Sequence, residues 1–171
     1  MGGTSHGNDK VHTAMKITIA CVGKIKEKYL CDAIEEYSKR LSRYCNLSIK
    51  EVPDEKAPQN ISKSEEDIIK NKEGERLSKH IQGYTIALAI DGEALTSEGF
   101  SALLEDKKTK GISSVTFVIG GSLGLSDEIL KKADMKLSFS KMTFPHMLMR
   151  VILLEQLYRA NKISNNEPYH K

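Results

Sequence analysis

The chain has 171 residues, of which 39% are hydrophobic, and its formal net charge is +3 at pH 7. This length supports one well-packed core and leaves little material for a second full domain. No apolar run approaches the roughly 20 residues that a membrane span needs, no signal peptide is visible, and cysteines and histidines show no metal-ligand spacing. We therefore expect a cytoplasmic protein without a membrane span or a bound metal.

The first fourteen residues, MGGTSHGNDKVHTA, are polar and aperiodic, and a second methionine follows them. We interpret residues 1–14 as an expression leader, which places the native start at Met15. Residues 15–171 then form a single domain, because no linker in them is long enough to divide the chain.

Charge is spread unevenly along this domain. Residues 141–171 hold five Lys/Arg against two Asp/Glu, and residues 15–43 hold seven against four. Two basic ends around an acidic middle fit an anion-facing surface, although solvated charge is the commoner meaning of such segments. The three cysteines are odd in number and lack C-x-x-C spacing, so we expect reduced, partly buried thiols.

The amino-terminal half alternates between two periodicities. The β-branched run KITIACV predicts a strand, and an apolar stripe at helical spacing follows it. Further along, Ser64 begins a capping-box pattern ahead of a charged segment. In this half we predict strands at residues 16–22 and 47–52, and helices at residues 27–44 and 64–81.

The carboxyl-terminal half repeats the alternation. Asp91 and Gly92 indicate a turn, while Thr96 and Ser126 are N-cap candidates for two of the helices. We predict strands at residues 84–90, 115–119 and 135–139, and helices at residues 97–108, 127–133 and 144–162. Strands that alternate with helices, and that become apolar throughout, predict an α/β fold with a mostly parallel sheet.

A glycine-rich turn, IGGSLGL, follows the strand at residues 115–119. Its glycines do not give the G-x-G-x-x-G dinucleotide fingerprint, and no Lys-Ser/Thr follows at P-loop spacing. Residues without side chains at the carboxyl end of a strand let a ligand touch the backbone directly, so the turn predicts a nucleotide-like ligand near Gly120. A tight turn without a ligand is the alternative interpretation.

The last predicted helix is apolar almost all round and must be buried on most sides, which favours a subunit interface as well as the helix's own core. His146, Arg150, Glu155 and Arg159 are its exceptions, and buried polar groups of this kind need partners. A structural ion pair, such as Arg150 with Glu155 across a dimer, explains them as well as catalysis does.

Several motifs stand in one order along residues 15–171: KITIACVGKIKEKYL, EVPDEKAP, KEGERL, FVIGGSLGL, LSFSKMTFPHMLMRVILLEQLYRA and PYHK. In these motifs the chain resembles the ribosomal RNA large-subunit methyltransferase H family, which are small SPOUT-class enzymes. The resemblance implies a homodimeric α/β fold with a C-terminal trefoil knot, a device that periodicity alone does not reveal. It also implies S-adenosylmethionine as methyl donor, and N3-methylation of a pseudouridine in large-subunit (23S) rRNA on the assembled ribosome.

The same resemblance implies two groups of site residues. Cofactor binding is expected from Leu88, Gly120, Phe139, Ser140, Lys141, Met142, Thr143 and Phe144. Catalysis is expected from Arg159, Tyr169 and His170, in which His170 accepts the imino proton and Arg159 holds a phosphate or a base oxygen. RNA anchoring without proton transfer is an equally good role for these three residues.

Two other functions remain open at this stage. One is a catalytically silent ribosome-binding assembly factor that uses the basic ends of the chain. The other is a dehydrogenase-like nucleotide binder, against which the missing fingerprint argues.

Overall fold

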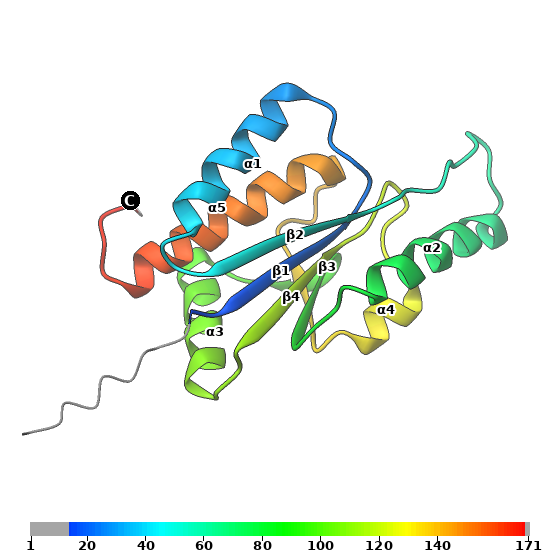
Figure 1. Ribbon diagram of the computed structural model, residues 1–171. Coiled ribbons are helices and arrows are strands. Elements are labelled where there is room, and N and C mark those ends of the chain that lie inside the picture. Colours follow the sequence, from blue (N-terminus) through cyan, green and yellow to red (C-terminus); the bar gives the residue numbers. More distant parts are fainter. Residues whose placement is uncertain (1–13, 170–171) are drawn as a thin grey trace, which may run out of the picture.

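Five strands form the central sheet of the chain, for which the computed structural model describes residues 14–169 (Figure 1). The strands are β1 (Lys16–Val22), β2 (Asn46–Val52), β3 (Tyr84–Ala94), β4 (Ser114–Ile119) and β5 (Met135–Ser138). Their order in the sheet is β2-β1-β4-β3-β5, and every neighbouring pair is parallel. The prediction of a mostly parallel α/β sheet is therefore confirmed.

Helices cover both faces of this sheet. They are α1 (Lys28–Leu41), α2 (Lys63–Ser78), α3 (Ser97–Thr109), α4 (Asp127–Lys132) and α5 (His146–Ser164). The long helix α5 packs against both α1 and α3 on one face, while α2 and α4 contact each other on the opposite face (Figure 1). The result is a three-layer arrangement with the sheet buried between two helical layers.

The alternation of side chains along β1 divides the core in two. Ile17 and Ile19 point toward the α5 side, where the fully buried leucines of α5 meet them. Ala20 and Val22 belong to the second core, together with Leu77 of α2. Because successive side chains of a strand point to opposite faces, one short β-branched run serves both helical layers.

The prediction of a turn at Asp91-Gly92 is wrong, because β3 continues through these residues to Ala94. Its pairing with β5 shifts register between Leu88 and Glu93. A Cβ atom on Gly92 would lie only 2.7 Å from the carbonyl carbon of Lys136 in β5. The glycine therefore permits two backbones to approach closely beside a bulge, a role that resembles a turn signal in sequence.

Helix boundaries follow the side chains that cap them. Ser62 rather than the predicted Ser64 caps α2, since its Oγ accepts a hydrogen bond of 3.2 Å from the backbone N–H of Glu65. The caps predicted at Thr96 and Ser126 are confirmed by bonds of 3.0 and 3.3 Å to the backbone N–H groups of Gly99 and Ile129. Helix α1 ends at Leu41, three residues before the predicted end.

The cysteines are free thiols in two different environments. Cys21 and Cys45 are buried, and this burial raises the pKa of each thiol to about 11. Both therefore remain protonated at neutral pH and act as small apolar side chains. Cys31 is exposed, a difference that the sequence did not reveal.

The expected leader and the expected catalytic tail lie partly outside the residues that the structure describes. Residues 1–13 of the expected leader, together with His170 and Lys171, fall outside the described residues. The trefoil knot stays a prediction. Within residues 14–169, no helix is long and apolar enough to span a membrane, and no cluster of His, Cys, Asp and Glu side chains has the makings of a metal site.

Candidate functional site

The carboxyl ends of β3, β4 and β5 meet at one edge of the sheet and surround a cleft of about 710 Å³. Its walls come from the end of β3, the glycine turn after β4, the segment between β5 and α5, and the first turn of α5. Seven of the eight predicted cofactor residues line it: Leu88, Gly120, Phe139, Ser140, Met142, Thr143 and Phe144. Lys141 is exposed and is not among the residues that line the cleft. Cofactor binding by these eight residues stays a prediction.

The glycine turn presents bare backbone to this cleft. The carbonyl of Gly121 accepts a hydrogen bond of 3.0 Å from the N–H of Gly124, which closes the turn. A Cβ atom on Gly120 would lie 2.6 Å from the carbonyl carbon of Gly124, closer than real side chains approach a backbone. The turn therefore keeps this shape only with glycine at position 120, and the backbone beside the cleft stays uncovered.

Residues 139–145 form the opposite wall, and their polar groups are used to shape the loop. The Ser140 hydroxyl accepts a hydrogen bond of 3.0 Å from the Met142 N–H, while the Ser138 hydroxyl donates to the Ser140 carbonyl at 3.1 Å. Met142 is 73% exposed and Phe144 is 36% exposed, which is unusual for large apolar side chains. An apolar surface left open at a cleft is suited to a flat, partly apolar ligand.

Arg150 fastens the first turn of α5 to the end of β1. Its guanidinium is fully buried, donates to the carbonyl oxygens of Val22 and Gly23 at 2.7 and 2.6 Å, and pairs with Glu51 at 2.6 Å. Within residues 14–169 the partner of Arg150 is Glu51, while a pair of Arg150 with Glu155 across a dimer stays a prediction. A buried guanidinium with three partners explains Arg150 as a structural clamp beside the cleft.

His146 is the titratable residue that lines the cleft, at the first position of α5. Its ring Nε2 lies 3.9 Å from the position that a Cβ atom on Gly23 would take, so the imidazole sits near the carboxyl end of β1. Burial, and then the positive charge of Arg150, lowers the pKa of His146, while Asp54 opposes the shift. The sequence marked His146 only as an exception on an apolar helix, and its membership of the cleft was missed.

The predicted catalytic residues form a separate cluster at the other end of α5. Arg159 pairs with Glu155 at 2.6 Å, and its guanidinium carbon lies 4.8 Å from the centroid of the Tyr169 ring. The Tyr169 hydroxyl donates to Glu155 at 3.3 Å, and its ring packs edge-on against Tyr158. The structure thus brings Arg159 and Tyr169 together, while His170 lies outside the described residues.

Within one chain, the cleft and the cluster of Arg159, Glu155 and Tyr169 are too far apart to contact the same reacting group. His146 and Arg159 are thirteen positions apart on the same helix, which corresponds to about 20 Å along its axis. The sequence motifs that carry the two groups are close in sequence, yet a straight helix holds them apart. A single reaction centre that uses both groups requires a second copy of the chain.

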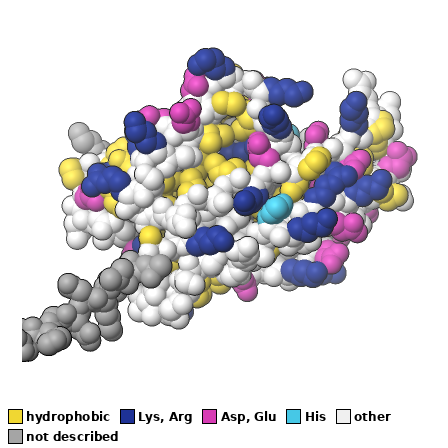
Figure 2. Space-filling model, viewed as in Figure 1, with side chains coloured by type: hydrophobic (Ala, Val, Ile, Leu, Met, Phe, Trp, Pro, Cys, Tyr) yellow, Lys and Arg dark blue, Asp and Glu magenta, His cyan; other side chains and the backbone are white. Residues whose placement is uncertain are grey.

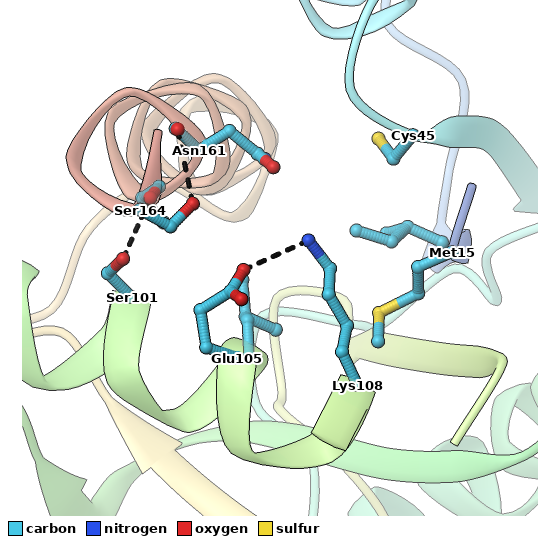
Figure 3. A pocket seen from close by; sticks show the side chains of 10 residues that line it. Met15, Cys45, Ser101, Glu105, Lys108, Asn161 and Ser164 are labelled. Carbon is cyan, nitrogen blue, oxygen red and sulfur yellow. Dashed lines mark hydrogen bonds and ion pairs between the residues drawn. The ribbon is translucent and has the colours of Figure 1, made fainter. Parts of the chain in front are cut away.

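A second, much smaller cavity lies between the start of β1, α3 and α5, and Figure 3 shows its lining. Its volume is about 10 Å³, room for one water at most. The hydroxyl of Ser101 donates to the Ala160 carbonyl at 2.8 Å, and Lys108 pairs with Glu105 at 3.1 Å (Figure 3). These polar groups already have partners, so this small cavity offers no site comparable to the cleft.

A family model described as a predicted SPOUT methyltransferase matches residues 15–170. The chain belongs to the SPOUT methyltransferase family. It is 62% identical over 159 residues to the ribosomal RNA large subunit methyltransferase H of Bifidobacterium adolescentis, a match that covers 92% of this chain and 100% of the relative. The protein of the same name from Clostridium novyi is 60% identical with the same coverage.

Solved structures give a weaker likeness to this SPOUT chain. A methyltransferase of Legionella pneumophila with SAM bound matches with a TM-score of 0.48 and 13% identity, covering 85% of this chain and 66% of that one. A methylase family protein of Haemophilus influenzae matches with a TM-score of 0.49 and 11% identity, covering 94% and 72%. The family assignment rests on the family model and the sequence relatives.

Proposed function

We propose that this chain transfers a methyl group from S-adenosylmethionine to N3 of a pseudouridine in large-subunit ribosomal RNA. The relatives that share about 60% of its residues are named large-subunit ribosomal RNA methyltransferases, which supports the reaction and the class of RNA. The single observation that carries the cofactor assignment is the cleft, because seven of eight residues expected to hold S-adenosylmethionine line one cavity.

The donor set of the cleft fits this cofactor. Phe139, Met142 and Phe144 offer apolar surface for an adenine ring, and the uncovered backbone of the glycine turn offers N–H and C=O groups for its edges. Lys141 is exposed and does not line the cleft, so its proposed contribution is through its backbone alone. When bound, S-adenosylmethionine supplies an activated methyl group on a positively charged sulfur.

The RNA-facing side is proposed to lie next to the first turn of α5. Lys24 and Lys26 follow Gly23, whose carbonyl Arg150 holds, and both side chains are exposed. Neither lysine forms an ion pair within residues 14–169, so both charges remain available for phosphate groups. Arg159, Tyr169 and His170 supply a second set of RNA-binding or catalytic side chains from the tail.

The working unit is proposed to be a homodimer, because one chain keeps its cleft and its tail about 20 Å apart on α5. No residue of α5 is fully exposed, but Leu148, Val151 and Ile152 remain only half-buried. On the face seen in Figure 2, apolar side chains gather between α1 and β2 with Lys and Arg around them. Half-buried apolar residues of these two elements are Ile34, Tyr37, Leu47 and Ile49.

Assembled cytoplasmic ribosomes are the proposed substrate, and the test uses ribosomes that lack the modification. We expect the protein and S-adenosylmethionine to convert one large-subunit pseudouridine to its N3-methyl form, detected by mass spectrometry of RNase fragments. Isolated large subunits and free 23S rRNA serve as comparison substrates and should react at least about tenfold more slowly, a difference near 1.4 kcal/mol. Unmodified RNA in every sample would contradict the proposed reaction.

A catalytically silent assembly factor is separated from this enzyme by calorimetry. The cleft predicts saturable binding of S-adenosylmethionine to the isolated protein, whereas a factor that only docks on ribosomes gives no heat. Light scattering at micromolar concentration tests the dimer in the same samples. A stable monomer would contradict the composite arrangement of cleft and tail.

A further inference from the structure

The cleft contains a single side chain that can exchange a proton near neutral pH. Its eighteen lining residues are otherwise aliphatic, aromatic, thioether, glycine, proline, serine or threonine, and His146 alone carries an imidazole. A methyl transfer to N3 of a pseudouridine must also remove the proton that N3 carries. The residue that accepts this proton must reach the place where the methyl group is transferred.

The position of His146 is fixed by its surroundings. It follows Pro145, the N-cap residue of α5, and one helical turn later Arg150 ties the helix to Val22, Gly23 and Glu51. The ring is half-buried and, within residues 14–169, no hydrogen bond engages either of its nitrogens. Glu51 and Asp54 are acidic groups near His146, and Glu51 is already paired with Arg150. The buried carboxylate of Glu73 lies behind Gly121 of the cleft wall and accepts a hydrogen bond of 3.0 Å from the backbone N–H of Glu55.

The charge state of His146 suits a proton acceptor. Burial and the adjacent guanidinium of Arg150 both disfavour the imidazolium, which lowers its pKa below the ordinary value of 6.5, and Asp54 offsets only part of this. The ring is therefore neutral at pH 7 and has a nitrogen lone pair available. A histidine held protonated by a paired carboxylate would not have this capacity.

The described groups of the tail are less suited to the task. Burial, followed by the charge of Glu155, raises the pKa of Tyr169, so its phenol stays protonated and already donates to that carboxylate. Arg159 is a permanent cation paired with Glu155. Binding an anionic RNA backbone requires groups of this kind, whereas accepting a proton requires a neutral base.

We propose that His146 is the general base that accepts the N3 proton of the target pseudouridine, an inference that rests on the proposed function. An imidazole nitrogen takes the proton, and the N3 electron pair forms the new bond to the methyl carbon. The carbon–sulfur bond of the sulfonium breaks with its electrons remaining on sulfur, which gives a neutral thioether. The imidazolium then returns the proton to solvent, so charge and atoms balance.

The test is single-turnover methylation of unmodified ribosomes at saturating S-adenosylmethionine, measured from pH 5 to pH 9. Wild-type protein should lose rate about tenfold per pH unit below the pKa of His146 and stay level above it. His146→Gln should be at least about 100-fold slower at pH 7, and its rate should climb toward pH 9, where N3 ionises without a base. Binding of S-adenosylmethionine by the variant, followed by calorimetry, should stay within about threefold of wild type, since one 0.6 kcal/mol contact is worth that much.

His170→Gln is the matched comparison. If His146 is the base, this variant loses rate without losing the acid limb of the profile. An acid limb that disappears with His170→Gln, or a His146→Gln protein within threefold of wild-type rate with an unchanged profile, would overturn the inference. If His146→Gln fails to fold, His146→Asn replaces it in the same comparison. The pH profiles of wild type and His170→Gln then show which histidine gives the acid limb. Wild-type protein that never methylates the ribosome overturns the proposed function itself, and this outcome is distinct because it precedes any variant.

Discussion

The two ends of α5 carry the two halves of the proposed site, and they are built in opposite ways. At the amino-terminal end, bare glycine backbone, exposed Met142 and the unbonded ring of His146 surround an open cleft. At the carboxyl-terminal end, Arg159, Glu155 and Tyr169 satisfy one another. The amino-terminal end has polar and apolar groups without a partner in the chain, whereas the polar groups at the carboxyl-terminal end pair with one another.

This difference matches what the proposed function requires, in which the cleft binds S-adenosylmethionine and the tail cluster contacts RNA. A cleft must hold unsatisfied groups in place, so rigid neighbours such as the Arg150 clamp support it. A surface cluster that meets RNA must remain soluble when RNA is absent, and mutual pairing of its charges achieves this. Helix α5 is held rigidly beside the cleft at one end, and at its other end it carries the residues that lead into the tail.

The largest expected difference between the ends concerns stability. Arg150→Met removes a buried cation and leaves Glu51 and two carbonyl groups without their donor, which should destabilise the fold by about 3 kcal/mol. Arg159→Met, the same substitution at the partly exposed end, should cost about 1 kcal/mol or less. Urea unfolding of both proteins measures the two values, and equal losses would remove the distinction between clamp and surface pair.

Cofactor binding should depend on the cleft end alone. Gly120→Ala places a methyl group 2.6 Å from the backbone of Gly124, so the turn must move and affinity for S-adenosylmethionine should fall at least about tenfold, or 1.4 kcal/mol. Gly99→Ala is the control, because the nearest atom to its added methyl group is the hydroxyl oxygen of Thr96, the N-cap residue of α3, at 3.2 Å. Calorimetry on both variants, with melting temperatures to confirm folding, tests the placement; unchanged affinity in Gly120→Ala would refute it.

The rate of ribosome methylation should depend on the tail, even though binding of S-adenosylmethionine should not. A chain that stops after Glu167 loses the edge-on contact between Tyr158 and Tyr169, worth about 1 kcal/mol, and should still fold and bind S-adenosylmethionine. Its methylation of ribosomes should fall at least about tenfold, because Tyr169 and His170 are absent. Wild-type turnover would remove these residues from the reaction, and a parallel loss of cofactor binding would show that the tail only supports the fold.

The smallest expected difference is a pH dependence of stability. Because burial and Arg150 lower the pKa of His146 in the folded state, the unfolded chain binds more protons as pH falls below 6.5. The folded state therefore loses stability in acid, and His146→Gln should lose less than wild type between pH 6.5 and pH 5. His80→Gln, in a chain position away from the cleft, is the control; identical acid sensitivity of all three proteins would contradict the assigned environment.

Sequence patterns predicted elements whose cause is local. The β-branched run of β1, the caps at Thr96 and Ser126 and the glycine turn after β4 each depend on residues within a few positions, and all were located correctly. Gly92 shows the limit of this approach. A glycine is required at position 92 because the backbone of β5, more than forty residues later in the chain, lies close to it. No local sequence pattern distinguishes such a contact from a turn.

The same limit applies to the site. Resemblance to known motifs named seven residues that line the cleft, and it placed catalysis in a tail that one chain holds about 20 Å away along α5. Both assignments stay predictions. His146 was visible as a histidine on an apolar helix, but its meaning depends on Gly23 and Arg150 packing around it. Distance along a helix and burial by distant strands decide its environment, and both require the three-dimensional fold.

Photolabelling with S-adenosylmethionine carrying an isotopic methyl group tests the central claim most directly, because it asks which end of α5 holds the cofactor. After ultraviolet irradiation and trypsin digestion, the label should appear in the peptides at residues 111–131 or 142–150, which contain the glycine turn and the cleft wall with His146. Excess unlabelled S-adenosylmethionine should remove it. Label in the tail peptide at residues 163–171, with the cleft peptides unlabelled, would contradict the account.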